Sequence, residues 1–221
     1  MIVVIDGPAG AGKSTVARRL ARRLGAAYLD TGAMYRALTL VAAERGVAAS
    51  DAAALAALAA AVPVELIPED DGDRVLVDGR DVTDAIRAPA VSAAVSEVSA
   101  HAGVRDAMVA AQRRVAAAGG DWVADGRDLG TVVWPDADLK VFLTASDRER
   151  ARRRHAELRD RGEECTEEEV LADVRRRDHL DSSRAVAPLR PAADAVRIDS
   201  SDMDAGQVVE RIAALVREVR A

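Results

Sequence analysis

Residues 7–15 read Gly7-Pro8-Ala9-Gly10-Ala11-Gly12-Lys13-Ser14-Thr15, and this stretch decides the fold. It fits the Gly-x-x-x-x-Gly-Lys-[Ser/Thr] pattern of a phosphate-binding loop, and it stands between an apolar run at 2–5 and a segment of helical spacing at 16–24. Glycines let backbone N–H groups turn inward around a polyphosphate, and the start of the next helix adds partial positive charge. Lys13 has the reach to contact the β- and γ-phosphates, and the Ser14 hydroxyl suits Mg²⁺. The alternative is a glycine-rich turn that binds nothing, and the strand–loop–helix context argues against it.

The composition indicates a globular protein that binds a small ligand. A chain of 221 residues, 49% of them hydrophobic, is long enough for one good core and a small insert. The net charge of −6 argues against a protein that coats nucleic acid, whose surface is usually basic. Cys165 is the only cysteine, so there is no disulfide framework, and the three histidines are not spaced as metal ligands. The sequence shows no signal peptide and no long apolar stretch, so we expect a cytoplasmic protein.

Apolar runs alternate with helical patterns along most of the chain, which predicts a parallel βα fold. The expected strands lie at 2–5, 27–29, 122–124, 139–143 and 195–198. Thr31 is the expected N-cap of a helix that continues to Gly46, and Asp51 is the expected cap of a short helix before Pro63. Further helices are expected at 91–98 and 104–117. Ser146 with Glu149 and Thr166 with Glu169 predict capping boxes for two arginine-rich helices, and apolar residues at 208–219 predict a closing helix.

A different pattern interrupts the chain at about 62–82. Residues 64–67 and 74–77 have strand character, with Asp71-Gly72 between them and Asp78-Gly79 after them. Asp-Gly between two such runs is a strong hairpin signal. The sequence therefore predicts a small antiparallel sheet inserted into a helical region.

Three polar clusters follow predicted strands: the phosphate-binding loop, residues 30–36 and residues 125–128. Ligands of open α/β sheets bind at the carboxyl ends of the strands, so these clusters predict one shared site. Arg36 lies about one helical turn beyond Thr31, although both could instead be ordinary residues of a surface helix. Arginines also gather at 148–154 and 175–177. They suit a small anionic ligand, or they cover solvated helix faces.

Four segments together resemble the bacterial cytidylate kinases, and the similarity extends over nearly the whole chain. They are the phosphate-binding loop, Asp30-Thr31-Gly32-Ala33-Met34-Tyr35-Arg36, residues 124–133 with Asp125-Gly126-Arg127-Asp128, and residues 177–189 with Arg184-Ala185-Val186-Ala187-Pro188-Leu189. The last two segments are far more specific than the loop alone. The resemblance implies an α/β P-loop nucleoside-monophosphate-kinase fold, in which a five-stranded parallel sheet is wrapped by helices and carries the small insert and a helical lid.

The resemblance also implies a reaction, the transfer of the γ-phosphoryl group of ATP to CMP or dCMP. It implies one domain, with a core at about 1–35, 100–150 and 178–221, a monophosphate-binding region at about 36–99 and a lid at about 151–177. Mg²⁺ is the implied cofactor, on Ser14 and through water on Asp128. The implied partners are small molecules, with neither nucleic acid nor membrane, and the enzyme is expected to be a monomer.

Residue roles carry over by position. The implied ATP site comprises Gly7, Pro8, Ala9, Gly10, Ala11, Gly12, Lys13, Ser14 and Thr15. The implied catalytic groups, which surround the transferring phosphate, are Lys13, Arg150, Arg153, Arg154 and Arg177. The implied CMP site comprises Thr31, Arg36, Ser96, Arg105, Arg127, Asp128, Asp181 and Arg184. Arg36, Arg105 and Arg127 correspond to arginines that hold the acceptor phosphate. Ser96, Asp181 and Arg184 correspond to groups that recognise the cytosine or its sugar.

Cytosine chemistry fits these roles, because a carboxylate accepts from its N4 amino group and arginine or serine donates to its ring acceptors. Asp181 and Arg184 are three apart, so on a helix they would share a face. Two alternatives stay open at this point: a kinase for UMP or AMP, and a non-catalytic nucleotide-binding module. A GTPase switch is disfavoured because the sequence has no Asn-Lys-x-Asp motif.

Overall fold

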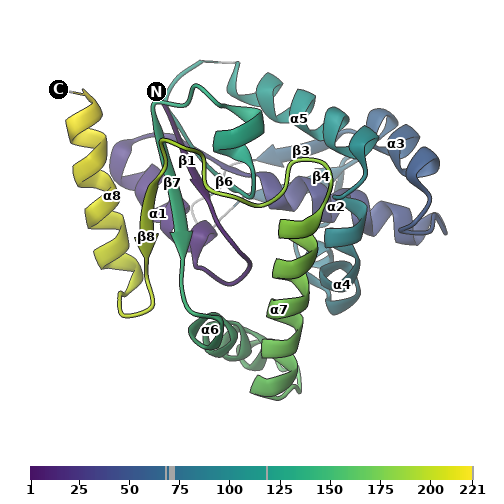
Figure 1. The fold of residues 1–221 in the computed structure, drawn as a ribbon. Coiled ribbons are helices and arrows are strands. Elements are labelled where there is room, and N and C mark those ends of the chain that lie inside the picture. The colour runs from purple at the N-terminus through teal and green to yellow at the C-terminus, as the bar shows by residue number, and fades with distance from the viewer. Residues whose placement is uncertain (68, 70–72, 118, 221) are drawn as a thin grey trace.

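A five-stranded parallel sheet stands at the centre of the protein, in a computed structural model that describes residues 1–67, 69, 73–117 and 119–220 (Figure 1). Its strands are β1 (Ile2–Asp6), β2 (Ala27–Asp30), β6 (Trp122–Gly126), β7 (Leu139–Thr144) and β8 (Val196–Asp199), in the order β2-β6-β1-β7-β8. Every pairing between neighbouring strands is parallel. The predicted sheet is therefore confirmed.

Both faces of the sheet are covered, because strand β1 is apolar on each side. Val3 and Ile5 pack in one cluster with α1 (Lys13–Leu24) and α8 (Ala205–Arg220). Val4 belongs to the cluster on the opposite face, which includes residues of η2 (Leu129–Val133) and partly buried residues of α5 (Ala102–Ala116). Gly25 in the left-handed conformation ends α1.

A second core joins helices to the small sheet. It combines α2 (Thr31–Glu44), α3 (Ala52–Ala61), η1 (Ala85–Arg87), α4 (Pro89–Val98) and α5 with the antiparallel strands β3 (Val64–Ile67), β4 (Arg74–Val77) and β5 (Arg80–Asp81). The predicted insert is confirmed, and Asp78-Gly79 makes the turn between β4 and β5. The turn expected at Asp71-Gly72 lies outside the described residues.

Helices α6 (Asp147–Asp160) and α7 (Glu167–Ser183) pack together and project from the carboxyl edge of the sheet (Figure 1). Thr166 and Glu169 form the predicted capping box at the start of α7. In the described part of the chain, no helix is both long and apolar enough to cross a membrane.

Three local predictions were wrong. Asp30, not Thr31, is the N-cap of α2, since its carboxylate accepts from the Ala33 N–H while Thr31 is the first helical residue. Ser146 caps α6, but Glu149 completes no capping box because its carboxylate is held by Arg152 and Arg153. Arg184 does not share a helical face with Asp181, because α7 ends at Ser183 and Arg184 is extended.

Candidate active site

The phosphate-binding loop follows β1 and lies directly against β7. A Cβ atom at Gly7 would come within 1.9 Å of the Leu143 carbonyl oxygen, so only glycine permits this approach. Gly12, with φ of 83°, is the N-cap of α1 and offers no side chain to the first N–H groups of the helix. These N–H groups and the positive end of the helix dipole are therefore available to an anion.

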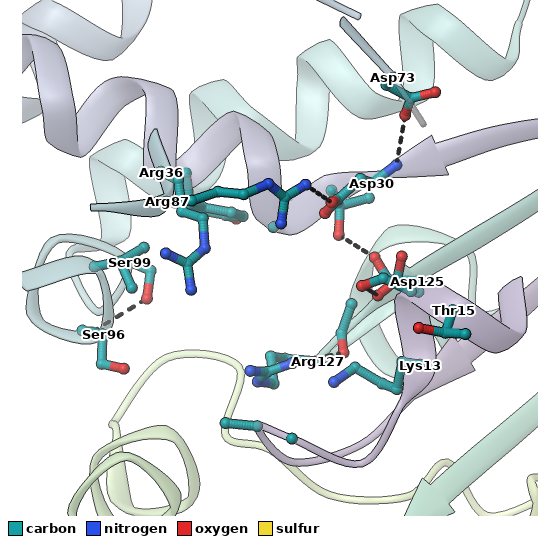
Figure 2. Close-up of a pocket in the computed structure, with 18 of the residues that line it drawn as sticks. Lys13, Thr15, Asp30, Arg36, Asp73, Arg87, Ser96, Ser99, Asp125 and Arg127 are labelled. Atoms are coloured by element: carbon teal, nitrogen blue, oxygen red, sulfur yellow. Dashed lines mark hydrogen bonds and ion pairs between the residues drawn. The ribbon is translucent and has the colours of Figure 1, made fainter. Parts of the chain in front are cut away.

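The three predicted polar clusters meet at one cavity of about 1030 Å³ at the carboxyl edge of the sheet. Figure 2 shows Lys13 and Arg127 close together on one side and Arg36 and Arg87 on the other. The cavity is lined by all eight residues expected to bind CMP, and by six of the nine in the loop: Ala9, Gly10, Gly12, Lys13, Ser14 and Thr15.

Lys13 is buried, and its Nζ donates to the Pro8 carbonyl oxygen at 2.9 Å. The pKa of Lys13 is lowered from 10.5 to about 7, because burial and, after it, the nearby Arg127 outweigh the carboxylates of Asp125 and Asp6. An incoming phosphate would favour the protonated lysine. The loop therefore holds its lysine in a position where an anionic ligand stabilises its charge.

Ser14 contacts a carboxylate that the sequence analysis did not select. Its Oγ donates to Asp125 Oδ2 at 2.9 Å, and the Tyr28 hydroxyl donates to Oδ1 at 2.7 Å. Burial, and after it Asp30, raises the pKa of Asp125 to about 6. Thr31 donates to the Asp125 carbonyl oxygen at 2.6 Å, so this hydroxyl also braces the end of β6. The signal in the sequence was the position of Asp125 at the end of a predicted strand.

Asp128, which was expected to work with Ser14, instead pairs with two arginines. Arg105 contacts one carboxylate oxygen, and Arg184 contacts the other at 3.4 Å. All three side chains are buried, and Ser96 lines the same part of the wall. Arg105 also donates to the Ser99 carbonyl oxygen at 3.3 Å. This end of the cavity is therefore built from hydrogen-bonding groups in fixed positions.

Two further arginines of the expected CMP site point into the cavity. Arg36 donates to Ser92 Oγ at 2.9 Å and to the Ile86 carbonyl oxygen at 3.3 Å, and burial lowers its pKa to about 9. Arg127 Nε donates to Asp181 Oδ2 at 3.0 Å. Burial by itself would raise the pKa of Asp181, but Arg127 together with Arg177 and Arg184 outweighs burial, and the net pKa is lowered. Asp181 is thus an ionised partner of Arg127.

The four arginines expected around the transferring phosphate divide into two pairs. Arg154 and Arg177 line the cavity, and burial lowers the pKa of Arg177. Arg150 and Arg153 are not among the lining residues. Arg150 donates to the Ala9 carbonyl oxygen under the loop at 3.0 Å, and Arg153 donates to the Ser200 carbonyl oxygen beyond β8 at 2.6 Å.

Comparison with known proteins agrees with this geometry. The family model for cytidylate kinase matches residues 3–218. A cytidylate kinase of Rhodococcus opacus (strain B4) is 52% identical over 99% of this chain and 95% of the relative. One of Geobacillus kaustophilus (strain HTA426) is 53% identical over 98% of this chain and 96% of the relative. The chain belongs to the cytidylate kinase family.

As a cytidylate kinase, the chain is an enzyme that transfers the γ-phosphoryl group of ATP to CMP or dCMP, as the sequence predicted. The comparisons favour neither a UMP or AMP kinase nor a non-catalytic module. Among solved structures, an uncharacterized protein from Eubacterium ventriosum ATCC 27560 aligns over 98% of both chains with a TM-score of 0.55. At 11% identity this likeness supports the fold alone.

Several residues at this cavity were not predicted from the sequence. Arg87 pairs with Asp30 at 3.9 Å across the cavity rim, and Asp73 from the insert accepts from the Asp30 N–H at 3.4 Å (Figure 2). Burial raises the pKa of Asp73 to about 6. Gln112 lies at the back of the cavity. Arg87, Asp73 and Gln112 belong to no motif, so no pattern in the sequence pointed to them.

Proposed function

We propose that phosphoryl transfer takes place in this cavity, with the phosphates of ATP on the phosphate-binding loop and CMP or dCMP bound opposite. The observation that carries the proposal is the placement of Lys13 and Arg127 across the cavity from Arg36 (Figure 2). Two phosphate chains entering from opposite sides would meet between these cations. Transfer of a phosphoryl group depends on such positioning and charge neutralisation more than on a covalent intermediate.

Lys13, Arg154 and Arg177 are the proposed catalytic residues, since they line the cavity at the loop and at the lid. Each would bind phosphate oxygens that gain charge during transfer. Arg150 and Arg153 are better placed to act as positioning residues, because their guanidinium groups hold the loop and the end of β8. Arg36 and Arg127 would hold the acceptor phosphate.

Mg²⁺ is the proposed cofactor, and the donor set at Ser14 fits it. Among the described residues no group of three or more histidine, cysteine or acidic side chains forms a metal cage. Mg²⁺ needs no such cage, because it commonly takes one or two protein groups together with substrate phosphates and water. Ser14 and Asp125 would hold it, and Asp128 would act through water only after release from Arg105 or Arg184. The ion would neutralise phosphate charge.

The proposed division of the chain places the monophosphate-binding region at about 36–99 and the lid at about 151–177, on a core formed by 1–35, 100–150 and 178–221. The packed pair α6 and α7, which projects beyond the sheet, supports the lid. The enzyme is proposed to be a monomer, as the resemblance implies. We expect the enzyme to act on free nucleotides in the cytoplasm and to bind no nucleic acid.

Steady-state assays of ADP release with CMP, dCMP, UMP, AMP and GMP test this assignment when wild type is compared with Arg36→Met. We expect the KM for CMP to rise at least tenfold, since a charged hydrogen bond is worth about 1.5–3 kcal/mol, while the KM for ATP stays within about twofold. Arg45→Met is the matched control, because Arg45 is exposed and pairs with exposed Asp78. An unchanged KM for CMP in Arg36→Met would place the acceptor elsewhere.

A further inference from the structure

A buried glutamine at the back of the cavity makes no hydrogen bond of ordinary geometry with the residues that the structure describes. Gln112 lies on α5 and only 1% of it is exposed. Neither its Nε2 nor its Oε1 makes a hydrogen bond of ordinary geometry with any group in the described part of the chain, although the amide lies close enough to the Tyr35 hydroxyl to lower the pKa of that group. Buried polar groups are nearly always paired, because an unpaired one loses its hydration and gains nothing in return. The partner of this amide is therefore expected to come from outside the chain.

A second unpaired group lies on the same stripe of α5. Arg105 precedes Gln112 by seven residues, which is about two helical turns, so both side chains leave the helix on one face. The guanidinium group of Arg105 is fixed by Asp128 and by the Ser99 carbonyl oxygen, and it lies 5.6 Å from the centre of the Tyr35 ring. Its Nε is nevertheless buried without a partner. One wall of the cavity thus contains two unpaired donors, Arg105 Nε and Gln112 Nε2, and one unpaired acceptor, Gln112 Oε1.

The chemistry of this wall suits a neutral, planar ligand group. A phosphate offers only acceptors, and the cavity already meets it with Lys13, Arg36 and Arg127. The amide of Gln112 offers a donor and an acceptor side by side, and the edge of a pyrimidine base has the same mixture. We propose that Gln112 is a specificity-determining residue that hydrogen-bonds the base of the acceptor nucleotide. This inference rests on the proposed placement of that nucleotide in the cavity.

The test replaces Gln112 with methionine, which has nearly the same length and shape but no amide. We measure the KM for CMP, dCMP, UMP and ATP, and the melting temperature with and without CMP. Removing an unpaired buried amide should leave the melting temperature of the free protein unchanged or higher. The KM for CMP should rise by about ten- to fiftyfold, and the stabilisation by CMP should shrink, because two hydrogen bonds to the base are lost. The KM for ATP should stay the same.

Met108→Leu is the matched control, since Met108 is buried on the same stripe of α5 and carries no hydrogen-bonding amide. It should leave all four KM values near those of wild type. A wild-type KM for CMP in Gln112→Met, or an equal rise for CMP and ATP, would overturn the proposal and leave Gln112 as the holder of a buried water. If Gln112→Met does not fold, Gln112→Asn replaces it, because the shorter amide also withdraws from the base.

The Arg36→Met measurement separates this inference from the proposed function. If Arg36→Met impairs CMP binding and Gln112→Met does not, only the role of Gln112 fails. If neither variant affects CMP, the acceptor is not bound in this cavity, and both proposals fail together.

Discussion

Arg150 offers the sharpest test of how the arginines of α6 and α7 act, because its side chain is 3% exposed and donates to four groups. Nε donates to the Ala145 carbonyl oxygen at 2.9 Å and Nη1 to the Ala9 carbonyl oxygen at 3.0 Å. Nη2 contacts Asp147 at 2.5 Å and Asp178 at 2.6 Å. The guanidinium group therefore connects the phosphate-binding loop to the start of α6 and to the C-terminal part of α7, and it is not among the residues that line the cavity.

The cost of Arg150→Met follows from these contacts. The two buried bonds to carbonyl oxygens come from a charged donor and contribute about 1.5 kcal/mol each, at the low end of such bonds. The pairs with Asp147 and Asp178 add little, because these carboxylates are 46% and 26% exposed and are screened by water. The expected loss is about 3 kcal/mol of unfolding free energy, which lowers the melting temperature of a chain of this size by about 6–12 °C.

Thermal unfolding and steady-state turnover, measured on the same preparations, decide the matter. We expect kcat of Arg150→Met to fall by no more than about tenfold at 25 °C, through displacement of the loop at Ala9. Arg152→Met is the matched control on α6, because Arg152 is 63% exposed and its ion pair is with Glu149 on the same helix. An unchanged melting temperature together with a loss of about a thousandfold or more in kcat would refute this reasoning and restore the catalytic role expected from the sequence.

Three more results are expected. Lys13→Ala should fold normally but lose turnover by orders of magnitude. Because the pKa of Lys13 is lowered to about 7, Lys13 is mostly neutral near pH 8, and binding of ATP without Mg²⁺ should raise this pKa and cause proton uptake by the wild type. Calorimetry should find no such proton uptake in Lys13→Ala. Amides across about 148–178 should gain protection from hydrogen exchange with a bisubstrate analogue, and unchanged protection would argue against a lid there. Asp181→Ala should lower kcat/KM for CMP and UMP by the same factor if its task is to hold Arg127, whereas a loss confined to CMP would support base reading.

The features predicted correctly from the sequence were those that local rules determine. An apolar run before a glycine-rich loop leaves few alternatives to a buried strand, and the close contact of Gly7 with Leu143 shows why the loop needs glycine there. Alternation of βα units then orders the sheet. The start of α2 shows where such rules become ambiguous, because Asp30 and Thr31 are both good N-cap residues. The Thr31 hydroxyl donates instead to the Asp125 carbonyl oxygen on the neighbouring strand β6, and Asp30 caps the helix.

Residue roles on α6 were beyond local rules, because consecutive arginines on a helix point in different directions. Arg150 faces the loop, Arg153 faces the end of β8, and Arg154 faces the cavity. The sequence shows that arginines cluster at 148–154, but it does not show which way each side chain points. Gln112 was not predicted for a related reason. Its proposed role is inferred from its unpaired amide, and whether that amide is paired depends on how α5 packs against the rest of the cavity wall.

The charges of the cavity explain how an acidic protein with a net charge of −6 prepares a site for anions. Cations held close together in a buried cavity repel one another and lose hydration, and the lowered pKa values of Lys13, Arg36, Arg177 and Arg184 report that cost. Carboxylates such as Asp128 and Asp181 offset part of it while no nucleotide is bound. If nucleotides bind as proposed, their phosphates would supply the remaining countercharge. Binding would then reduce the repulsion among the cations, most of all where the two phosphate chains would meet.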